Sequence, residues 1–445
     1  MRLLFLLTLA LVGAQAMASE TTAFVNVNVV PMSSEKVVPE QTVVVSGDRI
    51  VAIGMVDDVS IPRGAKLVDG TDRYLIPGLA EMHAHVPDPD SSALGRYFSL
   101  YVANGVTTIR GMLGRPAHLQ LRDDLETGKV FGPRLVTSGP SFNDRSVAGT
   151  SQARDMVTAQ QAAGYDFVKI HPGLTGAEFD ALADTANALD FPFAGHVTLA
   201  AGVPRVLEKG QSTIDHLDGY FAALLPPDSD GLGGYGGFFD AFLADEIEVD
   251  RIKAIAAATA AAGTWNVPTE VLVEQLIDNT PIQELRNRPE MRYMPRAMVD
   301  DWARAKESQL ADHDYSADVA ALAIKLRRQL ILELHRAGAG LLLGSDSPQI
   351  FNVPGFSIHR ELESLVAAGL TPYEALQTGT VSVAVFLGSD TGLVETGRAA
   401  DLVLLDANPL ADIRNTRRIH GVMLRGTWHA AATLENSLLP YRNAD

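Results

Sequence analysis

The sequence predicts an α/β protein in which a (β/α)8 TIM barrel carries a small β-sandwich domain formed by both chain termini. Two observations predict this fold. Between about residues 75 and 387, short apolar runs alternate with amphipathic helical stretches, as in parallel α/β folds. Near both termini the pattern changes to β segments separated by turn residues. We therefore assign residues 75–387 to the barrel, and residues 19–74 and 388–445 to one discontinuous small domain.

The first residues are typical of a secretory signal peptide. Arg2 precedes an apolar run over residues 3–13, and Ala14, Ala16 and Ala18 follow at alternate positions. The run is shorter than the ~20 residues that span a bilayer as a helix. We expect cleavage after Ala18, or less favourably after Ala16, so residues 1–18 leave no membrane anchor in a mature periplasmic or secreted chain. The chain contains no cysteine, which excludes disulfides and thiol chemistry.

The expected small domain has a hairpin near its N-terminal end. Residues 43–45 and 50–53 are apolar and mostly β-branched, and the turn residues 46–48 separate them. At the other end of the chain, residues 400–405 and 421–424 show the same pattern before further turn residues. Two β regions at opposite ends of a chain indicate one sheet domain to which both ends contribute.

The barrel assignment depends on eight β segments. The first ends near His83, and the others are residues 105–109, 134–138, 167–170, 191–197, 212–214, 264–267 and 341–344. Helical stretches such as 176–189 and 249–262 lie between them, and eight such units fit a closed barrel. After the seventh segment comes a helical insertion at about residues 280–330, which includes Arg292 and Tyr293. We expect this insertion to overhang the barrel mouth and to shape specificity.

Side chains suited to metal binding stand at the C-terminal ends of five segments, where barrels place their catalytic groups. His83 and His85 alternate on the first segment, so both point into the barrel and can hold one ion. The fourth, fifth, sixth and eighth segments end with Lys169, His196, His216 and Asp346. Each residue alone has an ordinary structural explanation, such as a satisfied histidine, a core salt bridge or a helix cap. Their joint occurrence indicates a metal site.

Four stretches resemble the amidohydrolase superfamily: residues 75–79 before His83-Ala84-His85, then 104–108, 344–346 and 395–404. The resemblance runs from about residue 43 to 426 and is strongest to the imidazolonepropionase-like branch, which contains prolidase-type dipeptidases. It implies two divalent metal ions, one held by His83, His85 and Asp346 and the other by His196 and His216. It also implies that Lys169, carboxylated on its amine, bridges the two ions.

The implied ligand set predicts a binuclear hydrolase that cleaves amide bonds. A carboxylated lysine can span ions ~4 Å apart, and a buried lysine amine can lose its proton. The two ions would share a bridging hydroxide near neutral pH, and Asp346 would be the catalytic group that passes its proton to the leaving nitrogen. The ligands suit zinc, while manganese, iron and cobalt stay open. The expected substrates are small dipeptides or N-acyl amino acids, cleaved in a prolidase-like reaction.

Three further residues are weaker candidates for substrate binding. Arg110 ends the second segment and could hold a substrate carboxylate, with a structural ion pair as an equal alternative. His171 shares the inward side with Lys169 but could lie beyond the strand. Tyr220, four residues after His216, could donate to a developing oxyanion or simply pack in a loop.

Two motif observations argue against dinucleotide binding and against a serine hydrolase. Gly231, Gly233 and Gly236 fit a dinucleotide fingerprint, but no strand precedes them, so we expect a flexible loop that could act as a lid. The sequence contains no G-x-S-x-G nucleophile elbow, which argues against a serine hydrolase.

The charge of the chain narrows its partners. A net charge of −18 without a basic cluster argues against nucleic acid, so a small-molecule substrate is expected, and a homo-oligomer stays open. Two alternatives to the binuclear enzyme remain. One is a mononuclear cyclic-amide hydrolase or deaminase of the same superfamily, which would not need Lys169 as a bridge. The other is a non-catalytic periplasmic binding protein, which would not need the complete ligand set.

Overall fold

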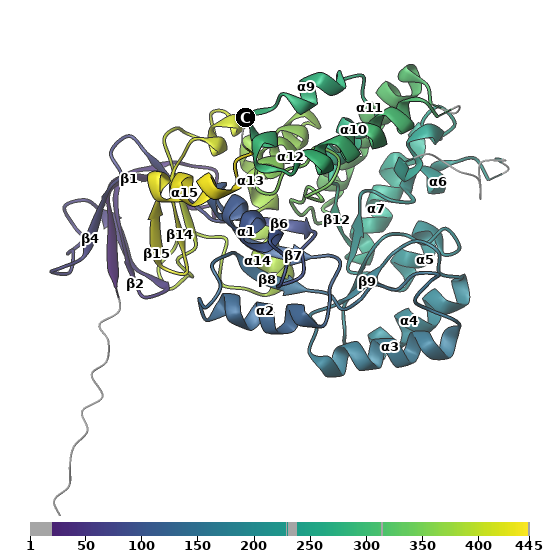
Figure 1. Ribbon diagram of the computed structural model, residues 1–445, viewed down its shortest axis with the longest axis horizontal. Helices are drawn as coiled ribbons and strands as arrows, with labels where there is room; N and C mark the ends of the chain where they lie inside the picture. Colours follow the sequence, from purple (N-terminus) through teal and green to yellow (C-terminus); the bar gives the residue numbers. More distant parts are fainter. Residues whose placement is uncertain (1–19, 228, 230–237, 313–314, 444–445) are drawn as a thin grey trace, which may run out of the picture.

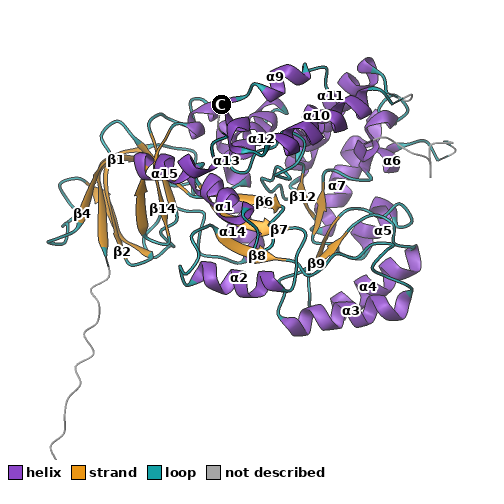
Figure 2. Ribbon diagram, viewed as in Figure 1, coloured by secondary structure: helices purple, strands orange, loops and turns teal. Residues whose placement is uncertain are grey.

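The computed structural model describes residues 20–227, 229, 238–312 and 315–443. A β-rich part, built from both ends of the sequence, lies beside a larger part in which helices surround short strands (Figures 1 and 2). The expected signal peptide and the glycine-rich loop at residues 231–236 lie outside the described residues.

The β-rich part is an eight-stranded sheet with the order β15-β14-β13-β5-β1-β2-β3, in which β4 also pairs with β1. Its strands are β1 (Thr21–Val29), β2 (Val38–Ser46), β3 (Arg49–Met55), β4 (Lys66–Asp69), β5 (Tyr74–Pro77), β13 (Leu402–Leu405), β14 (Ile419–Leu424) and β15 (Thr427–Ala430). The expected hairpin is confirmed, because β2 and β3 pair antiparallel around residues 46–49. Phe24 and Trp428, from opposite ends of the chain, meet edge to face at 5.2 Å in the core of this sheet.

Strand β5 differs from the expected boundary at residue 74. It pairs with β1 and β13 of the terminal sheet, although its sequence was assigned to the barrel. Alternation along the strand explains both assignments: Leu75 belongs to the core of the terminal sheet, whereas Ile76 belongs to the core of the larger part. The terminal sheet therefore ends at Pro77, and the larger part begins with the next strand.

The larger part contains two parallel sheets, one with the order β6-β7-β8 and one with the order β12-β11-β10-β9. The strands are β6 (Leu79–Ala84), β7 (Val106–Gly111), β8 (Arg134–Thr137), β9 (Val168–Ile170), β10 (Phe193–Gly195), β11 (Thr213–Asp215) and β12 (Trp265–Val267). Each coincides with an expected β segment. The expected segment 341–344 forms bridges but no extended strand among the described residues.

Isolated parallel bridges connect these sheets to one another. Ser138 bridges to Phe167, which joins the β8 side to the β9 side, and Asn266 of β12 bridges to Leu341. The segment that follows Leu341 then reaches β6, since the Met82 N–H donates to Leu343 and Ala84 bridges to Ser347. The segments that end in the candidate metal ligands are thus neighbours in space.

Helices cover the outside of these strands (Figure 2). They are α1 (Ala93–Ala103), α2 (Ala117–Glu126), α3 (Thr150–Ala163), α4 (Gly176–Ala188), α5 (Gly202–Glu208), α6 (Tyr220–Leu224), α7 (Ile252–Ala262), α8 (Glu270–Ile277), α11 (Ala317–Ala337), α12 (Phe356–Ala367), α13 (Pro372–Thr378) and α14 (Val381–Leu387). Helix α15 (Ala431–Leu438) instead lies against β14 and β15 of the terminal sheet. The expected insertion holds α9 (Ile282–Arg286), η3 (Pro289–Tyr293) and α10 (Arg296–Leu310). Short 3-10 turns are η1 (Phe238–Leu243), η2 (Val249–Arg251), η4 (Ile413–Arg417) and η5 (Leu439–Tyr441).

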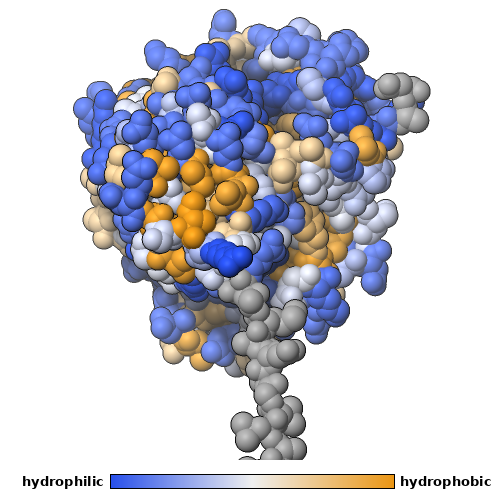
Figure 3. All heavy atoms as spheres, turned by 90° about the vertical axis from the view of Figure 1, so that its left-hand side faces the viewer, coloured by the Kyte–Doolittle hydropathy of each residue, from blue (hydrophilic) through white to orange (hydrophobic). Residues whose placement is uncertain are grey.

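The surface of the terminal sheet mixes polar and apolar side chains. Val51, Met55 and Leu67 of strands β3 and β4 are exposed, and the view onto this end shows apolar side chains gathered in patches (Figure 3). Among the helices in the described part of the chain, none is long and apolar enough to cross a membrane.

Candidate metal centre

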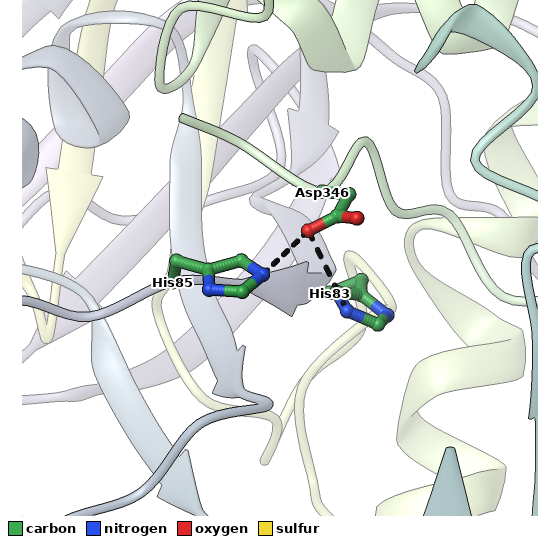
Figure 4. Close-up of side chains that lie close together, drawn as sticks. All are labelled: His83, His85 and Asp346. Atoms are coloured by element: carbon green, nitrogen blue, oxygen red, sulfur yellow. Dashed lines mark ion pairs between the residues drawn. The ribbon is translucent and has the colours of Figure 1, made fainter. Parts of the chain in front are cut away.

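The candidate ligands from the first and last segments meet at one point. His83 lies on β6 and His85 follows that strand, while Asp346 follows the bridging segment after Leu341. The Oδ1 atom of Asp346 lies 2.7 Å from Nε2 of His85 and 3.6 Å from Nε2 of His83 (Figure 4). One ligand atom from each residue falls within 4.8 Å of the others. These three side chains can therefore hold one metal ion.

The remaining candidate histidines continue this group as a row of imidazole rings. The ring centroids of His83 and His216 are 4.5 Å apart, those of His216 and His196 are 4.8 Å apart, and those of His196 and His171 are 5.1 Å apart. The rings come from the ends of β6, β11, β10 and β9. His171 thus lies at the site, next to a candidate ligand, although it follows the end of its strand.

Lys169 reaches the same place from the middle of β9 and is fully buried. Its Nζ lies 3.7 Å from Oδ2 of Asp215, and it has no hydrogen-bond partner among the described residues. Gly195 makes room for it: a Cβ at this position would lie 2.8 Å from Cδ of Lys169, and the backbone has a φ of +124°. The glycine that precedes His196 is therefore part of the site.

The electrostatics of the group favour neutral imidazoles and an ionised carboxylate. Burial holds the pKa of His83 and of His216 well below the usual value, and burial also lowers the pKa of Lys169. Burial opposes ionisation of Asp346, but His83 and His85 outweigh it and hold the pKa of this carboxyl below its usual range. Neutral nitrogens and a carboxylate are the forms that bind metal ions.

Several buried polar atoms in this group make no well-oriented hydrogen bond among the described residues, although Oδ2 of Asp215 and Oδ1 of Asp346 lie within ion-pair distance of His83 and His85. They are Nδ1 of His83, Nδ1 of His171, Nζ of Lys169, Oδ2 of Asp215 and Oδ1 of Asp346. Buried polar groups without partners are costly and rare. The donor set of imidazole nitrogens and carboxylate oxygens suits divalent transition metals such as zinc. The residues present therefore fit a metal centre.

A second layer of side chains orients the candidate ligands. Nδ1 of His196 lies 3.1 Å from Asp218, and Nδ1 of His216 lies 2.8 Å from the Thr269 hydroxyl. The side-chain amide of Gln349 donates to Oδ2 of Asp346 at 2.7 Å. Such partners fix the orientation of metal-binding imidazoles and carboxylates. Sequence reasoning missed all three, and the position of Asp218 two residues after His216 was the available signal.

Sequence reasoning also missed two buried acids that lie next to the candidate ligands. Asp215 of β11 lies 3.1 Å from Nδ1 of His83, and its position before His216 at a strand end could have indicated it. Glu81 of β6 accepts the backbone N–H groups of His83 and Ser345 at 3.0 and 2.8 Å. It therefore joins the two segments that carry His85 and Asp346. Burial raises the pKa of Glu81 to about 8.

Arg110 forms a structural ion pair, which is one of the two roles expected for it. The side chain is 1% exposed, its Nε donates to the carbonyl of Met82 at 2.7 Å, and its Nη2 donates to Asp215 at 3.2 Å. A buried guanidinium that makes these internal contacts cannot hold a substrate carboxylate. Arg110 instead keeps Asp215 ionised, because it and Lys169 lower the pKa of that carboxyl against the effect of burial.

Tyr220 does not reach the site as an oxyanion donor. It is fully buried at the start of α6. Its hydroxyl donates to Asn266 at 2.8 Å and lies 3.0 Å from the hydroxyl of Thr259. The aromatic side chain that lies against the ligands is instead Phe239, whose ring stacks on His216 at 4.4 Å with an interplanar angle of 7°.

The backbone is strained where it presents the ligands. His216, Asp346 and Thr269 have φ values of 63°, 58° and 45°, a left-handed conformation that non-glycine residues rarely adopt. Such strain collects at functional sites, where the surrounding structure holds it in place. Two of these residues contact the third: the Thr269 hydroxyl and the Asp346 carboxylate both lie next to His216.

Comparisons with known proteins identify the family to which the chain belongs. The model of the amidohydrolase family matches residues 74–429. An ochratoxinase from Aspergillus niger is 22% identical over 404 residues, which cover 83% of this chain and 78% of that protein. The adenine deaminase 3 of Rhizobium meliloti is 24% identical over 37% of this chain and 30% of its own length.

Solved structures share the fold over nearly the whole chain. A bottromycin amidohydrolase has a TM-score of 0.73 at 22% identity, and covers 95% of this chain and 90% of its own. A Xaa-Pro dipeptidase with bound methionine has a TM-score of 0.66 at 18% identity, and covers 92% of this chain and 100% of its own.

These matches confirm the resemblance seen in the sequence, and the structural neighbours include enzymes of the prolidase type. The alternative of a binding protein without catalysis is not supported. The chain belongs to the amidohydrolase family and is a hydrolase that acts on carbon–nitrogen bonds.

Proposed function

We propose that this chain is a binuclear metal-dependent amidohydrolase that cleaves the amide bond of small dipeptides or N-acyl amino acids, on a (β/α)8 barrel. The observation that carries the proposal is the meeting of four candidate histidine ligands, Lys169 and Asp346 at the ends of neighbouring parallel segments. The parallel bridges from β8 to β9 and from β12 through residues 341–347 to β6 support the barrel.

The proposed ligands form two sets around one lysine. His83, His85 and Asp346 would hold one ion, His196 and His216 the other, and Lys169, carboxylated on Nζ, would contribute to both. Burial lowers the pKa of Lys169, which favours the neutral amine that reacts with carbon dioxide, and one proton is released as the carbamate forms. When bound, the ions supply a nucleophile derived from water near neutral pH and polarise the scissile carbonyl.

The side chains of the protein perform the remaining steps. Oδ1 of Asp346 faces the imidazoles, which leaves Oδ2 to receive a proton and to return it to the departing amine nitrogen. His171, half-buried beside His196, is placed to donate to the substrate. Phe239 covers His216 and would exclude water from one side of the site.

The proposed substrate class comes from proteins of similar fold. Among them are a Xaa-Pro dipeptidase with bound methionine and a prolidase complexed with N-methylphosphonate-L-proline. An X-Pro dipeptide has the amide bond and the small size that the proposed site requires, and it is the first substrate to test.

A mononuclear deaminase or cyclic-amide hydrolase is the second candidate. The match to an adenine deaminase favours it, as does the compact group of His83, His85 and Asp346, which could serve a single ion. This candidate assigns no catalytic purpose to Lys169, so the two functions predict different metal contents and different effects of a substitution at Lys169.

Elemental analysis and a substrate screen decide between them. For protein purified without chelators we expect about two metal ions per chain, as in two-metal hydrolases, and turnover of X-Pro dipeptides or N-acyl amino acids. Lys169→Ala should lose at least one ion and most activity, with partial rescue by short-chain carboxylic acids that replace the carbamate. Lys129→Ala, at an exposed lysine, is the control. One ion at full activity, or a fully active Lys169→Ala variant, would contradict the binuclear proposal.

We also propose that the chain is exported and that the mature protein begins near Ser19. The basis is the charged, apolar and alanine-rich order of residues 2–18. N-terminal sequencing of protein expressed in a bacterial host tests this, and Met1 retained in the cytosolic fraction would contradict it.

A further inference from the structure

A large basic cavity lies in the helical insertion, apart from the metal ligands. It has a volume of about 740 Å³ and is lined by residues of α9, η3 and α10 together with Arg442 and Asn443 near the C-terminus. Among the described residues that line it, five are arginines, namely Arg286, Arg288, Arg292, Arg296 and Arg442, and one, Asp300, is acidic. In a chain with a net charge of −18, this local excess of positive charge needs an explanation.

The contacts of Arg292 and Arg442 hold these two side chains in position without cancelling their charge. Arg286 pairs with Asp300 at 2.6 Å, but Arg292 donates through Nε to the carbonyl of Pro289 at 2.6 Å. The guanidinium of Arg442 lies 6.0 Å from the centroid of the Tyr293 ring. Carbonyl groups and rings satisfy donors but bring no negative charge.

The positive charge of Arg288 is also poorly balanced by its contacts. It is half-buried, and its guanidinium donates to the neutral side-chain oxygen of Gln275. Burial, and after it the charge of Arg360, lowers its pKa to about 10. Three acids act on it: Glu290, which pairs with Arg360, Asp278, which pairs with Lys306, and Glu284. A carboxylate or phosphate group brought into the cavity would therefore gain a guanidinium whose charge is poorly compensated.

The shape and chemistry of the cavity indicate what it binds. Ligand pockets typically have volumes of ~300–1,000 Å³, so this cavity suits a small molecule. Guanidinium groups present fixed forks of donors that match carboxylate and phosphate oxygens. Here the forks come from several elements, while Met291 and Val299 supply buried apolar surface. An occupant that reaches several arginines at once must carry more than one anionic group on a short organic frame.

We propose that this cavity is a binding site for a small organic anion with two or more carboxylate or phosphate groups, distinct from the metal centre. The proposal goes beyond the hydrolase function and does not depend on it.

Calorimetric titration of the full-length protein tests the proposal. The probes are tricarballylate for carboxylates and glucose 1,6-bisphosphate for phosphates, and acetate is the monovalent control. All titrations use a fixed ionic strength of ~0.15 M, at which exposed charges are screened beyond ~8 Å. We expect at least one of the two polyanions to bind at one site per chain and acetate not to bind. The Arg292→Ala/Arg442→Ala double variant should weaken that binding at least tenfold.

A control variant outside the cavity and a second variant inside it complete the test. Arg304→Ala removes an exposed arginine from the same helix, α10, that does not line the cavity, and it should bind like the wild type. Arg296→Ala should weaken binding even if the double variant does not fold. Metal content, measured on the same samples, should stay unchanged in every arginine variant. Absence of binding by both polyanions, or equal binding by the wild type and the cavity variants, would overturn the proposal.

Discussion

In the proposed function, Asp346 combines metal binding and proton transfer on its two oxygens. Its Oδ1 lies among the imidazoles, and its Oδ2 accepts a hydrogen bond from Gln349. An asparagine at this position keeps one oxygen for a ligand and for the imidazoles, but it cannot accept a proton near neutral pH. The variant therefore separates metal binding from proton transfer.

For Asp346→Asn we expect the turnover number to fall by about 10²–10⁴-fold, the usual contribution of general acid–base catalysis. KM should change less, because the metal ions and the rest of the pocket still bind the substrate. Steady-state kinetics and elemental analysis on the same preparations check this. A variant that retains its metal and loses less than about tenfold in turnover would show that this proton transfer does not limit the reaction.

His359, a buried imidazole on α12, is expected to make the stability of the protein depend on pH. Its Nδ1 lies 3.0 Å from the Thr416 hydroxyl, and burial, with the nearby charge of Arg417, lowers its pKa from 6.5 to about 3. The unfolded chain therefore binds a proton that the folded chain excludes between these pH values. The free energy of unfolding should fall as the pH drops below about 6.5, by up to ~1.4 kcal/mol per pH unit for this residue.

His359→Gln should remove this part of the pH dependence and leave metal content unchanged. Urea unfolding of both proteins at neutral and at acidic pH measures the difference. If the wild type and the variant lose the same stability between the two pH values, His359 does not cause the acid sensitivity.

At the scale of elements, the backbone at the end of β10 makes room for the side chain of Lys169. Gly195 closes β10 with a φ of +124°, and a Cβ there would lie 2.8 Å from Cδ of Lys169 and closer still to the Ile170 carbonyl. Gly263 offers a matched control: it follows α7 with a φ of +71°, and a Cβ there would meet nothing within 4 Å.

Gly263→Ala should cost about 1–2 kcal/mol of unfolding free energy, the cost of a left-handed alanine. Gly195→Ala should cost more and should also lower the metal content, because the backbone and Lys169 must shift. Chemical unfolding and elemental analysis of both variants check this. Equal effects of the two substitutions would show that Gly195 matters only for its backbone conformation.

The candidate ligands could be found from the sequence because their positions follow from local rules. His83, Lys169 and His216 stand where alternation and strand ends place them, and these rules need no knowledge of distant residues. The role of Arg110 could not be decided in this way. Its partner Asp215 is 105 positions away in the sequence, and Tyr220 is similarly bound by Thr259 and Asn266. Burial of a polar side chain depends on contacts that form only when the chain folds.

For the molecule as a whole, strands β5 and β13 connect the terminal sheet to the larger part. Leu402 and Leu404 of β13 belong to the core of the sheet, whereas Val403 between them belongs to the core of the larger part. Ile76 and Leu75 of β5 divide in the same way. Because single strands contribute to both cores, we expect the two parts to lose their structure together, although chains of this length often unfold in steps.

Leu404→Ala tests this coupling at a residue of the sheet core rather than of the metal centre. The side chain is fully buried, so its truncation should cost about 2–5 kcal/mol. Urea unfolding can be followed by tryptophan fluorescence, to which Trp428 of the sheet core contributes, and by loss of bound metal. Both midpoints should fall by the same amount, because loss of the sheet exposes the apolar surface of Val403 and Ile76. Leu67→Ala, at a 65% exposed leucine of the same sheet, should stay within about 0.5 kcal/mol of the wild type. A variant whose fluorescence midpoint falls while its metal midpoint does not would show that the sheet unfolds independently of the metal centre.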